Sequence, residues 1–118
     1  MYDNLKQGKD DRREIVTFYD PSKFGKSCLR PCAYEHIYSL VNGVLDLTVV
    51  QASCDVPLGL PFNSFSFATL LMIMAQITGN RVGKVHHHII NVHVYEDQIE
   101  PLKEQLSRTP KHLSLIHI

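Results

Sequence analysis

The sequence places two kinds of reactive side chain before its midpoint: a cysteine near an arginine, and a pair of adjacent arginines. Cys32 follows Pro31 and lies two residues after Arg30. A positive neighbour lowers the pKa of a thiol and raises the fraction of nucleophilic thiolate, although most lone cysteines are small buried hydrophobes. Arg12 and Arg13 can clamp a phosphate, or they can be ordinary solvated charges. These residues indicate a nucleophile and an anion site only if other residues support them.

Polar residues also gather directly after a predicted strand at 44–50. QASCD (51–55) is a small polar cluster at a place where an ordinary domain would put a turn, and LPFN (60–63) resembles the entry to a helix. His93 and Tyr95 lie two apart on a later predicted strand, so they face the same side and can both donate to one ligand. Taken singly, each feature is better explained by packing than by binding.

The cysteine and histidine spacing does not favour a metal site. Cys28 and Cys32 lack a second ligand pair at the fixed spacing that is typical of zinc. The three consecutive histidines at 86–88 point to alternate faces of a strand, so they cannot converge on one ion. The sequence predicts no metal, with these histidines solvent-facing or partly packed.

Composition indicates one soluble, cytoplasmic domain. The chain has 118 residues, of which 44% are hydrophobic and 20% charged, and its twelve basic residues balance twelve acidic ones. This balance gives no general footprint for nucleic acid or for a membrane surface. No uninterrupted apolar run reaches the roughly 20 residues that span a bilayer, and the charged start does not resemble a signal peptide. The three cysteines, an odd number, indicate a reducing compartment.

The elements that must position these residues follow from periodicity and turn signals. Asn42-Gly43, between two alternating segments, is the strongest hairpin signal in the chain. Residues 64–78 are apolar nearly all round and predict a buried helix that ends at Gly79-Asn80. The predicted elements are a strand at 14–20, a loop at 21–31, the hairpin of 32–41 and 44–50, the helix 64–78, a strand at 84–95 and an amphipathic helix at 96–108 with Pro101 in its first turn. The fold class is α+β, with an antiparallel or mixed sheet and a central buried helix.

The chemical groups, taken together and in order, resemble one family. These groups are Arg12-Arg13, Pro31-Cys32, Gln51-x-Ser53-x-Asp55, Leu60-Pro61-Phe62-Asn63 and His93-x-Tyr95. With the flanking text DVPLGLPFN, MAQITG and KEQLSRTP, they resemble thymidylate synthase from the first turn to about Lys111. The resemblance implies a partial thymidylate synthase domain at 1–112. The last six residues (113–118), LSLIHI, are expected to be a non-native tail, since CTGTCTCTTATACACATC encodes them and resembles a transposon end used in sequencing libraries.

The resemblance implies an enzyme that methylates dUMP to dTMP with 5,10-methylenetetrahydrofolate, and a homodimer in a protein about twice as long. Cys32 matches the nucleophile of the family, and Asn63 matches the reader of the uracil edge. The other matches are Ser53 at the nucleotide phosphate, Arg12 and Arg13 at the phosphate of the partner subunit's site, His93 and Tyr95 at the 3′-hydroxyl, and Asp55 near the pterin of the folate. The isolated 118 residues are expected to be inactive.

This chain departs from the family at a few positions. Ala52 stands where the family has an arginine that holds the phosphate, Ala33 stands where a histidine follows the nucleophile, and 89–91 replaces a stretch richer in glycine and acid. Two alternatives stay open: a pyrimidine nucleotide hydroxymethylase, and a catalytically inactive nucleotide-binding remnant. Asn63 favours a uracil nucleotide, because relatives that use cytosine carry aspartate there.

Overall fold

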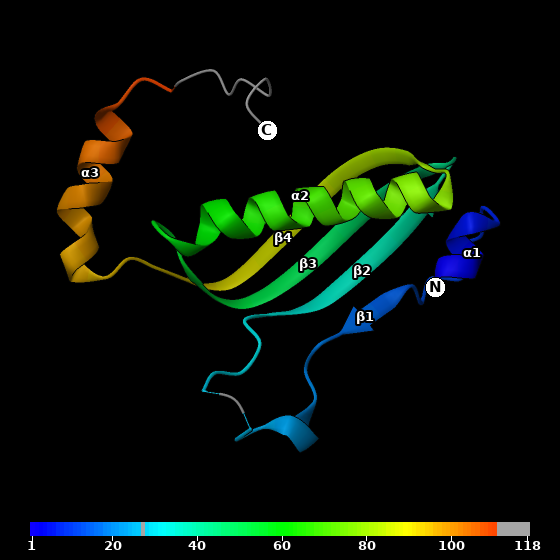
Figure 1. Cartoon of the computed structure of the whole chain (residues 1–118), viewed down its shortest axis with the longest axis horizontal. Helices are drawn as coiled ribbons and strands as arrows, with labels where there is room; N and C mark the ends of the chain where they lie inside the picture. The colour runs from blue at the N-terminus through cyan, green and yellow to red at the C-terminus, as the bar shows by residue number, and fades with distance from the viewer. Residues whose placement is uncertain (27, 111–118) are drawn as a thin grey trace.

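A mixed four-stranded sheet forms the centre of the computed structural model, which describes residues 1–26 and 28–110 (Figure 1). The strands lie side by side in chain order, and helices accompany them, which confirms the α+β fold class and the mixed sheet. The strands are β1 (Ile15–Thr17), β2 (Ala33–Val41), β3 (Val44–Asp55) and β4 (Arg81–His93). The strand predicted at 14–20 is shorter in the structure, because only residues 15–17 pair with β2.

The hairpin of β2 and β3 is confirmed, and β3 continues five residues beyond the predicted end at 50. Asn42 and Gly43 have φ values of 51° and 73°, the two positive values that a tight type I′ turn requires. The segment 51–55 has low intrinsic preference for strand. It is extended because β2 pairs with its start, at Gln51, and β4 pairs with it as far as Asp55.

Helix α2 (Gly59–Thr78) connects β3 to β4, which pair in parallel, so these three elements form a crossover unit. The helix begins five residues earlier than predicted. Pro61 lies in its first turn, where the missing N–H of a proline is not needed. The helix ends at Gly79, whose φ of 73° gives the left-handed cap expected there.

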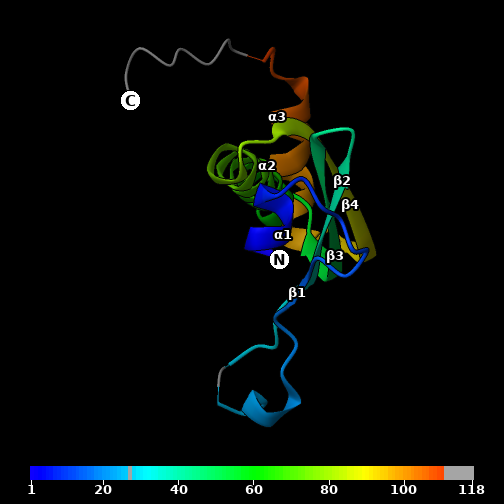
Figure 2. The same ribbon diagram turned by 90° about the vertical axis from the view of Figure 1, so that its right-hand side faces the viewer.

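The expected burial of α2 on all sides is wrong. One face packs on the sheet, whereas Phe62 and Phe65, on another face, are 75% and 74% exposed. Figure 2 shows why: the sheet covers the helix from one side, and no second layer formed by residues 1–26 and 28–110 covers the opposite side. The core is a single layer between α2 and the sheet, made by Leu5, Tyr38, Leu40, Leu45, Leu47, Val49, Phe67, Leu71, Met74 and Ala75.

With 20 residues, and a mean hydropathy of 1.4 over an 18-residue window, α2 is long and apolar enough by these two criteria to cross a membrane. The sequence-based expectation overlooked this because polar residues interrupt the apolar run. Core helices of water-soluble proteins pass the same test, and the buried residues of α2 pack against β2, β3 and β4.

The remaining elements lie at the ends of the sheet. Helix α1 (Tyr2–Lys6) places Leu5 in the core, and the Leu5 carbonyl accepts a hydrogen bond from Asn80 Nδ2 at 2.9 Å. A turn, η2 (Glu96–Gln98), follows β4 and leads into α3 (Ile99–Ser107), which has Pro101 in its first turn and buries none of its residues. The described residues 18–26 and 28–31, including η1 (Pro21–Lys23), project from one end of the sheet (Figure 2).

Candidate functional site

Gln51 joins three elements at the middle of the candidate site. Its side chain on β3 is 1% exposed. Its Nε2 donates to the Ser53 carbonyl at 2.8 Å, and its Oε1 lies 3.2 Å from Asn63 Nδ2 of α2 and 2.8 Å from His87 Nε2 of β4. Both ends of this buried amide therefore have hydrogen-bond partners, as buried polar groups require. Gln51 therefore ties the cluster 51–55 to the helix entry and to the next strand.

Cys32 lies at the start of β2, beside this cluster. The backbone N–H of Ala52 donates to the Cys32 carbonyl at 2.7 Å, and Ala33 pairs with Gln51. The Cys32 side chain is exposed, as a nucleophile must be. The structure thus brings together Pro31-Cys32 and QASCD at the open end of the hairpin.

A second thiol in the cluster has a different character. Cys54 is buried, and desolvation raises the pKa of its thiol, although hydrogen bonds with Gln51 and Asn63 act in the opposite direction. A buried thiol with a raised pKa is a poor nucleophile. Of these two cysteines, Cys32 is therefore the one suited to covalent chemistry.

The carboxyl ends of the parallel strands bring three predicted residues together. Asp55 and His93 are register partners on β3 and β4, and the His93 and Tyr95 rings meet edge to face with centroids 5.2 Å apart. Asp55 Oδ2 accepts from Gln98 Nε2 at 2.9 Å. His93 Nδ1 lies 2.9 Å from Asn91 Oδ1. Polar side chains from two strands and the η2 turn therefore gather at one edge of the sheet.

Arg12 and Arg13 lie elsewhere. Both are exposed on the link between α1 and β1, where their backbone N–H groups donate to Asp10 Oδ1 at 2.7 Å and Asp11 Oδ1 at 2.9 Å. Asp10 also accepts from the backbone N–H of Leu40 at 2.8 Å, close to the hairpin turn. Cys32 is at the other end of β2, so the chain's own fold does not bring the two arginines to the cysteine.

The position of Ala52 faces a hollow. Tyr19 and Tyr34 line this hollow together with Ala52, and their rings meet edge to face at 5.6 Å. Nearby, the Arg30 guanidinium lies 4.5 Å from the centroid of the Phe24 ring. The position where the resemblance puts an arginine therefore borders a hollow that two tyrosines also line.

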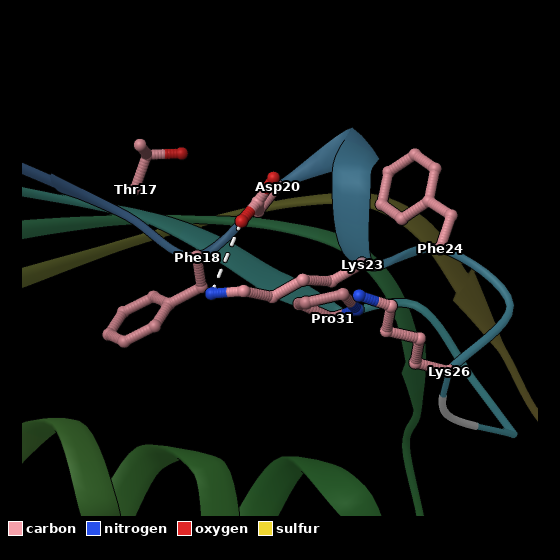
Figure 3. Close-up of a pocket in the computed structure, with 7 residues that line it drawn as sticks. All are labelled: Thr17, Phe18, Asp20, Lys23, Phe24, Lys26 and Pro31. Carbon is pink, nitrogen blue, oxygen red and sulfur yellow. Dashed lines mark ion pairs between the residues drawn. The ribbon is translucent and has the colours of Figure 1, made fainter.

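A larger hollow lies in the projecting segment (Figure 3). Lys23 and Asp20 form an ion pair of 3.2 Å across it, while the Lys26 side chain extends along its rim. Its lining consists of Thr17, Phe18, Asp20, Lys23, Phe24, Lys26 and Pro31. None of the predicted site residues belongs to this lining, but Pro31 directly precedes Cys32, so the hollow borders the segment that carries the predicted nucleophile.

The histidine run behaves as strand alternation predicts. His86 and His88 are exposed, whereas His87 is half-buried and faces α2, where its ring meets Phe67 edge to face at 5.0 Å. Among residues 1–26 and 28–110, no three metal-binding side chains form a group. The sequence missed His87 as a member of the candidate site, although its inward position could have been read from the strand period.

Three comparisons connect this geometry to known proteins. The family model described as thymidylate synthase matches residues 1–118. The thymidylate synthase of Pasteurella multocida is 52% identical over 119 aligned residues, which are 100% of this chain and 42% of that protein. The thymidylate synthase of Photobacterium profundum is 55% identical over 111 residues, covering 93% of this chain and 39% of that protein.

A solved structure agrees. The thermostable thymidylate synthase A of Bacillus subtilis superposes with a TM-score of 0.85 at 35% identity, over 92% of this chain and 39% of that one. This chain spans about two fifths of the length of the relatives it matches. Because the family model extends over the whole sequence and the fold agrees, the chain belongs to the thymidylate synthase family.

Proposed function

We propose that the protein carrying this chain methylates dUMP to dTMP, using 5,10-methylenetetrahydrofolate as carbon donor and reductant. The observation that supports this best is the position of the exposed Cys32, whose carbonyl accepts a hydrogen bond from Ala52, close to Gln51, whose buried amide meets Asn63 Nδ2. This arrangement sets a nucleophile beside a group able to read a base edge.

Cys32 is the proposed nucleophile. Its thiolate adds to C6 of the uracil ring, which makes C5 an enolate-like nucleophile and divides one difficult step into easier ones. C5 attacks the methylene carbon of the folate and then loses its proton. Elimination of tetrahydrofolate leaves an exocyclic methylene group on C5. Tetrahydrofolate then transfers a hydride to this methylene while the Cys32 thiolate is expelled from C6, which yields dTMP, dihydrofolate and the free enzyme.

The surrounding residues bind the two substrates in this proposal. The Asn63 amide donates to O4 of uracil and accepts from N3–H. Asp55, held by Gln98 at 2.9 Å, accepts from the N–H groups of the pterin. Ser53 binds the phosphate of dUMP, and His93 and Tyr95, whose rings are in contact, hold the 3′-hydroxyl.

The proposal also includes that the protein is a homodimer and that it is located in the cytoplasm. Arg12 and Arg13 are exposed and lie near the hairpin end of β2, whereas Cys32 lies at its other end. Arginines placed in this way suit the phosphate of a site on a neighbouring copy better than that of their own site.

The experiment uses the protein translated from the complete reading frame that contains this sequence. Tritium release from [5-³H]dUMP in the presence of methylenetetrahydrofolate should accompany dihydrofolate formation. Cys32→Ser should reduce the release to background, because a hydroxyl at neutral pH supplies almost no anionic nucleophile. Cys28→Ser, at an exposed cysteine of the projecting segment, is the matched control and should keep the activity.

Two results would contradict the proposal. Tritium release without dihydrofolate would indicate hydroxymethylation, in which water replaces hydride. No release by the unsubstituted protein would indicate an inactive nucleotide-binding remnant.

A further inference from the structure

His87 is the inward-facing member of the histidine run on β4, and the proposed mechanism gives it no role. Its Nε2 lies 2.8 Å from Gln51 Oε1, and its ring packs edge to face against Phe67 of α2. A ring held between a strand and a helix has one orientation. The question is which hydrogen-bonding groups this orientation fixes.

The Ser53 backbone carbonyl determines which end of the Gln51 amide donates and which end accepts, and this sets the direction of the other hydrogen bonds of Gln51. The Ser53 carbonyl can only accept, so the Gln51 group at 2.8 Å from it is the Nε2 amide nitrogen. The other end of the Gln51 amide, Oε1, can only accept as well. Both groups that meet it must therefore donate: Asn63 through Nδ2 at 3.2 Å, and His87 through an Nε2–H at 2.8 Å.

His87 is suited to be a permanent donor. Its burial lowers the pKa of the imidazole, and the neighbouring His88 lowers it further, so the ring is neutral at pH 7. A neutral ring carries one N–H. The bond to Gln51 Oε1 requires that this proton be on Nε2, which leaves Nδ1 as an acceptor.

The direction of the Asn63 amide decides which base it can read. With one N–H of Nδ2 committed to Gln51, a second N–H and the Oδ1 acceptor remain. This donor and acceptor match O4 and N3–H of uracil. Cytosine presents an amino donor and an N3 acceptor instead, the reverse pattern, and it would require the Asn63 amide to be turned around.

We propose that His87 is a positioning residue that selects uracil over cytosine, because its Nε2–H holds Gln51 Oε1 toward Asn63 and so fixes the direction of the Asn63 amide. The inference rests on the proposed binding of dUMP. His87 does not touch the base in this account. It acts through Gln51, and turning both amides around would leave His87 facing a donor instead of an acceptor.

The test compares two substitutions at this position in the protein translated from the complete reading frame. His87→Phe keeps a ring against Phe67 and removes the donor, whereas His87→Gln replaces the donor with an amide N–H. Dissociation constants are measured for dUMP and for dCMP. The preference for dUMP should fall about 2- to 10-fold in His87→Phe, the effect of one neutral hydrogen bond, and should be retained in His87→Gln. His88→Gln, one residue away and exposed, should match the unsubstituted protein.

A second readout does not depend on nucleotide binding. Two-bond ¹H–¹⁵N spectra of histidine-labelled protein should show the Nε2–H tautomer for one ring, whose signals are absent in His87→Gln. An Nδ1–H tautomer would overturn the inference, as would an unchanged dUMP preference in His87→Phe or equal losses in both variants. If the unsubstituted protein bound no dUMP, the proposed function would fail and the inference with it, while the tautomer spectrum would still report on the hydrogen bond.

Discussion

Ala52 is the residue at which this site differs most from what the family resemblance implies. Its backbone holds Cys32 in place, because its N–H donates to the Cys32 carbonyl at 2.7 Å. Its side chain faces the hollow lined by Tyr19 and Tyr34. The backbone role needs no particular side chain at this position, so an alanine preserves the strand while leaving out the guanidinium that the resemblance implies.

Restoring an arginine here should strengthen nucleotide binding. We expect Ala52→Arg to lower the KM for dUMP roughly ten- to a hundredfold, since a hydrogen bond to a charged group contributes about 1.5–3 kcal/mol and the hollow has room for the side chain. Steady-state kinetics at fixed folate measures this. Ala52→Met fills the hollow without charge and should leave the KM near that of the starting protein; a KM unaffected by the arginine would show that other groups already hold the phosphate.

For individual residues, the sequence indicated which side chains belong to the candidate site but not which groups they bind. Cys32, Ser53, Asp55, Asn63, His93 and Tyr95 were assigned through the resemblance of the ordered motifs to one family. The structure brings Cys32 to the cluster 51–55 and Asp55 to His93. Their roles as substrate ligands stay predictions. Gln51 and His87 could not be assigned, because their significance depends on hydrogen bonds that cross from β3 to α2 and β4.

Among the elements, the parallel pairing of β3 with β4 depends on an irregularity. Between the pairs Leu45–Val82 and Leu47–Val85, β4 has one more residue than β3. Asp46 Oδ1 accepts a hydrogen bond from the backbone N–H of Lys84 at 2.6 Å in this bulge. At Gly83, a Cβ would lie 2.0 Å from Asp46 Oδ1 and 2.7 Å from the Leu45 carbonyl. The strands therefore approach so closely that only glycine fits.

A methyl group at this bulge should destabilise the sheet. We expect Gly83→Ala to lower the free energy of unfolding by about 1–3 kcal/mol, because the backbone carbonyl of Leu45 cannot move aside cheaply. Urea unfolding followed by circular dichroism, at one protein concentration, measures the change. Lys84→Ala keeps the backbone N–H that Asp46 binds and should stay within about 0.5 kcal/mol of the unsubstituted protein. Equal stability of the Gly83 variant and the unsubstituted protein would contradict this account of the bulge.

The sequence predicted the hairpin well because its signal is local, in Asn42 and Gly43. It could not give the extension of β3 to Asp55, or the burial of only one face of α2, because both depend on neighbours distant in sequence. An apolar helix surface predicts that another segment of protein packs against it. The sequence does not say whether the covering segment belongs to the same stretch of chain.

On the scale of the whole molecule, this chain is an open layer with two apolar faces. Its radius of gyration is 17.1 Å, against about 13.5 Å for a compact domain of this length. The exposed residues of α2 include Phe62, Phe65, Met72, Ile73 and Ile77, and those of β4 include Val82, Ile90 and Val92. Many exposed apolar side chains on one helix and one strand are typical of an interface, which accords with a chain that spans about two fifths of its relatives.

The isolated 118 residues should therefore self-associate. We expect the purified chain to elute from a sizing column as oligomers larger than 13.5 kDa and to bind an apolar dye. Ile90 is 72% exposed on β4, so Ile90→Lys introduces a charge at an already exposed position and should shift the distribution toward the monomer. Ile90→Val is the matched control and should elute like the unsubstituted chain, since it keeps the surface apolar. If the unsubstituted chain were a monomer that binds no dye, its apolar faces would have to be covered by an arrangement different from the one in Figures 1 and 2.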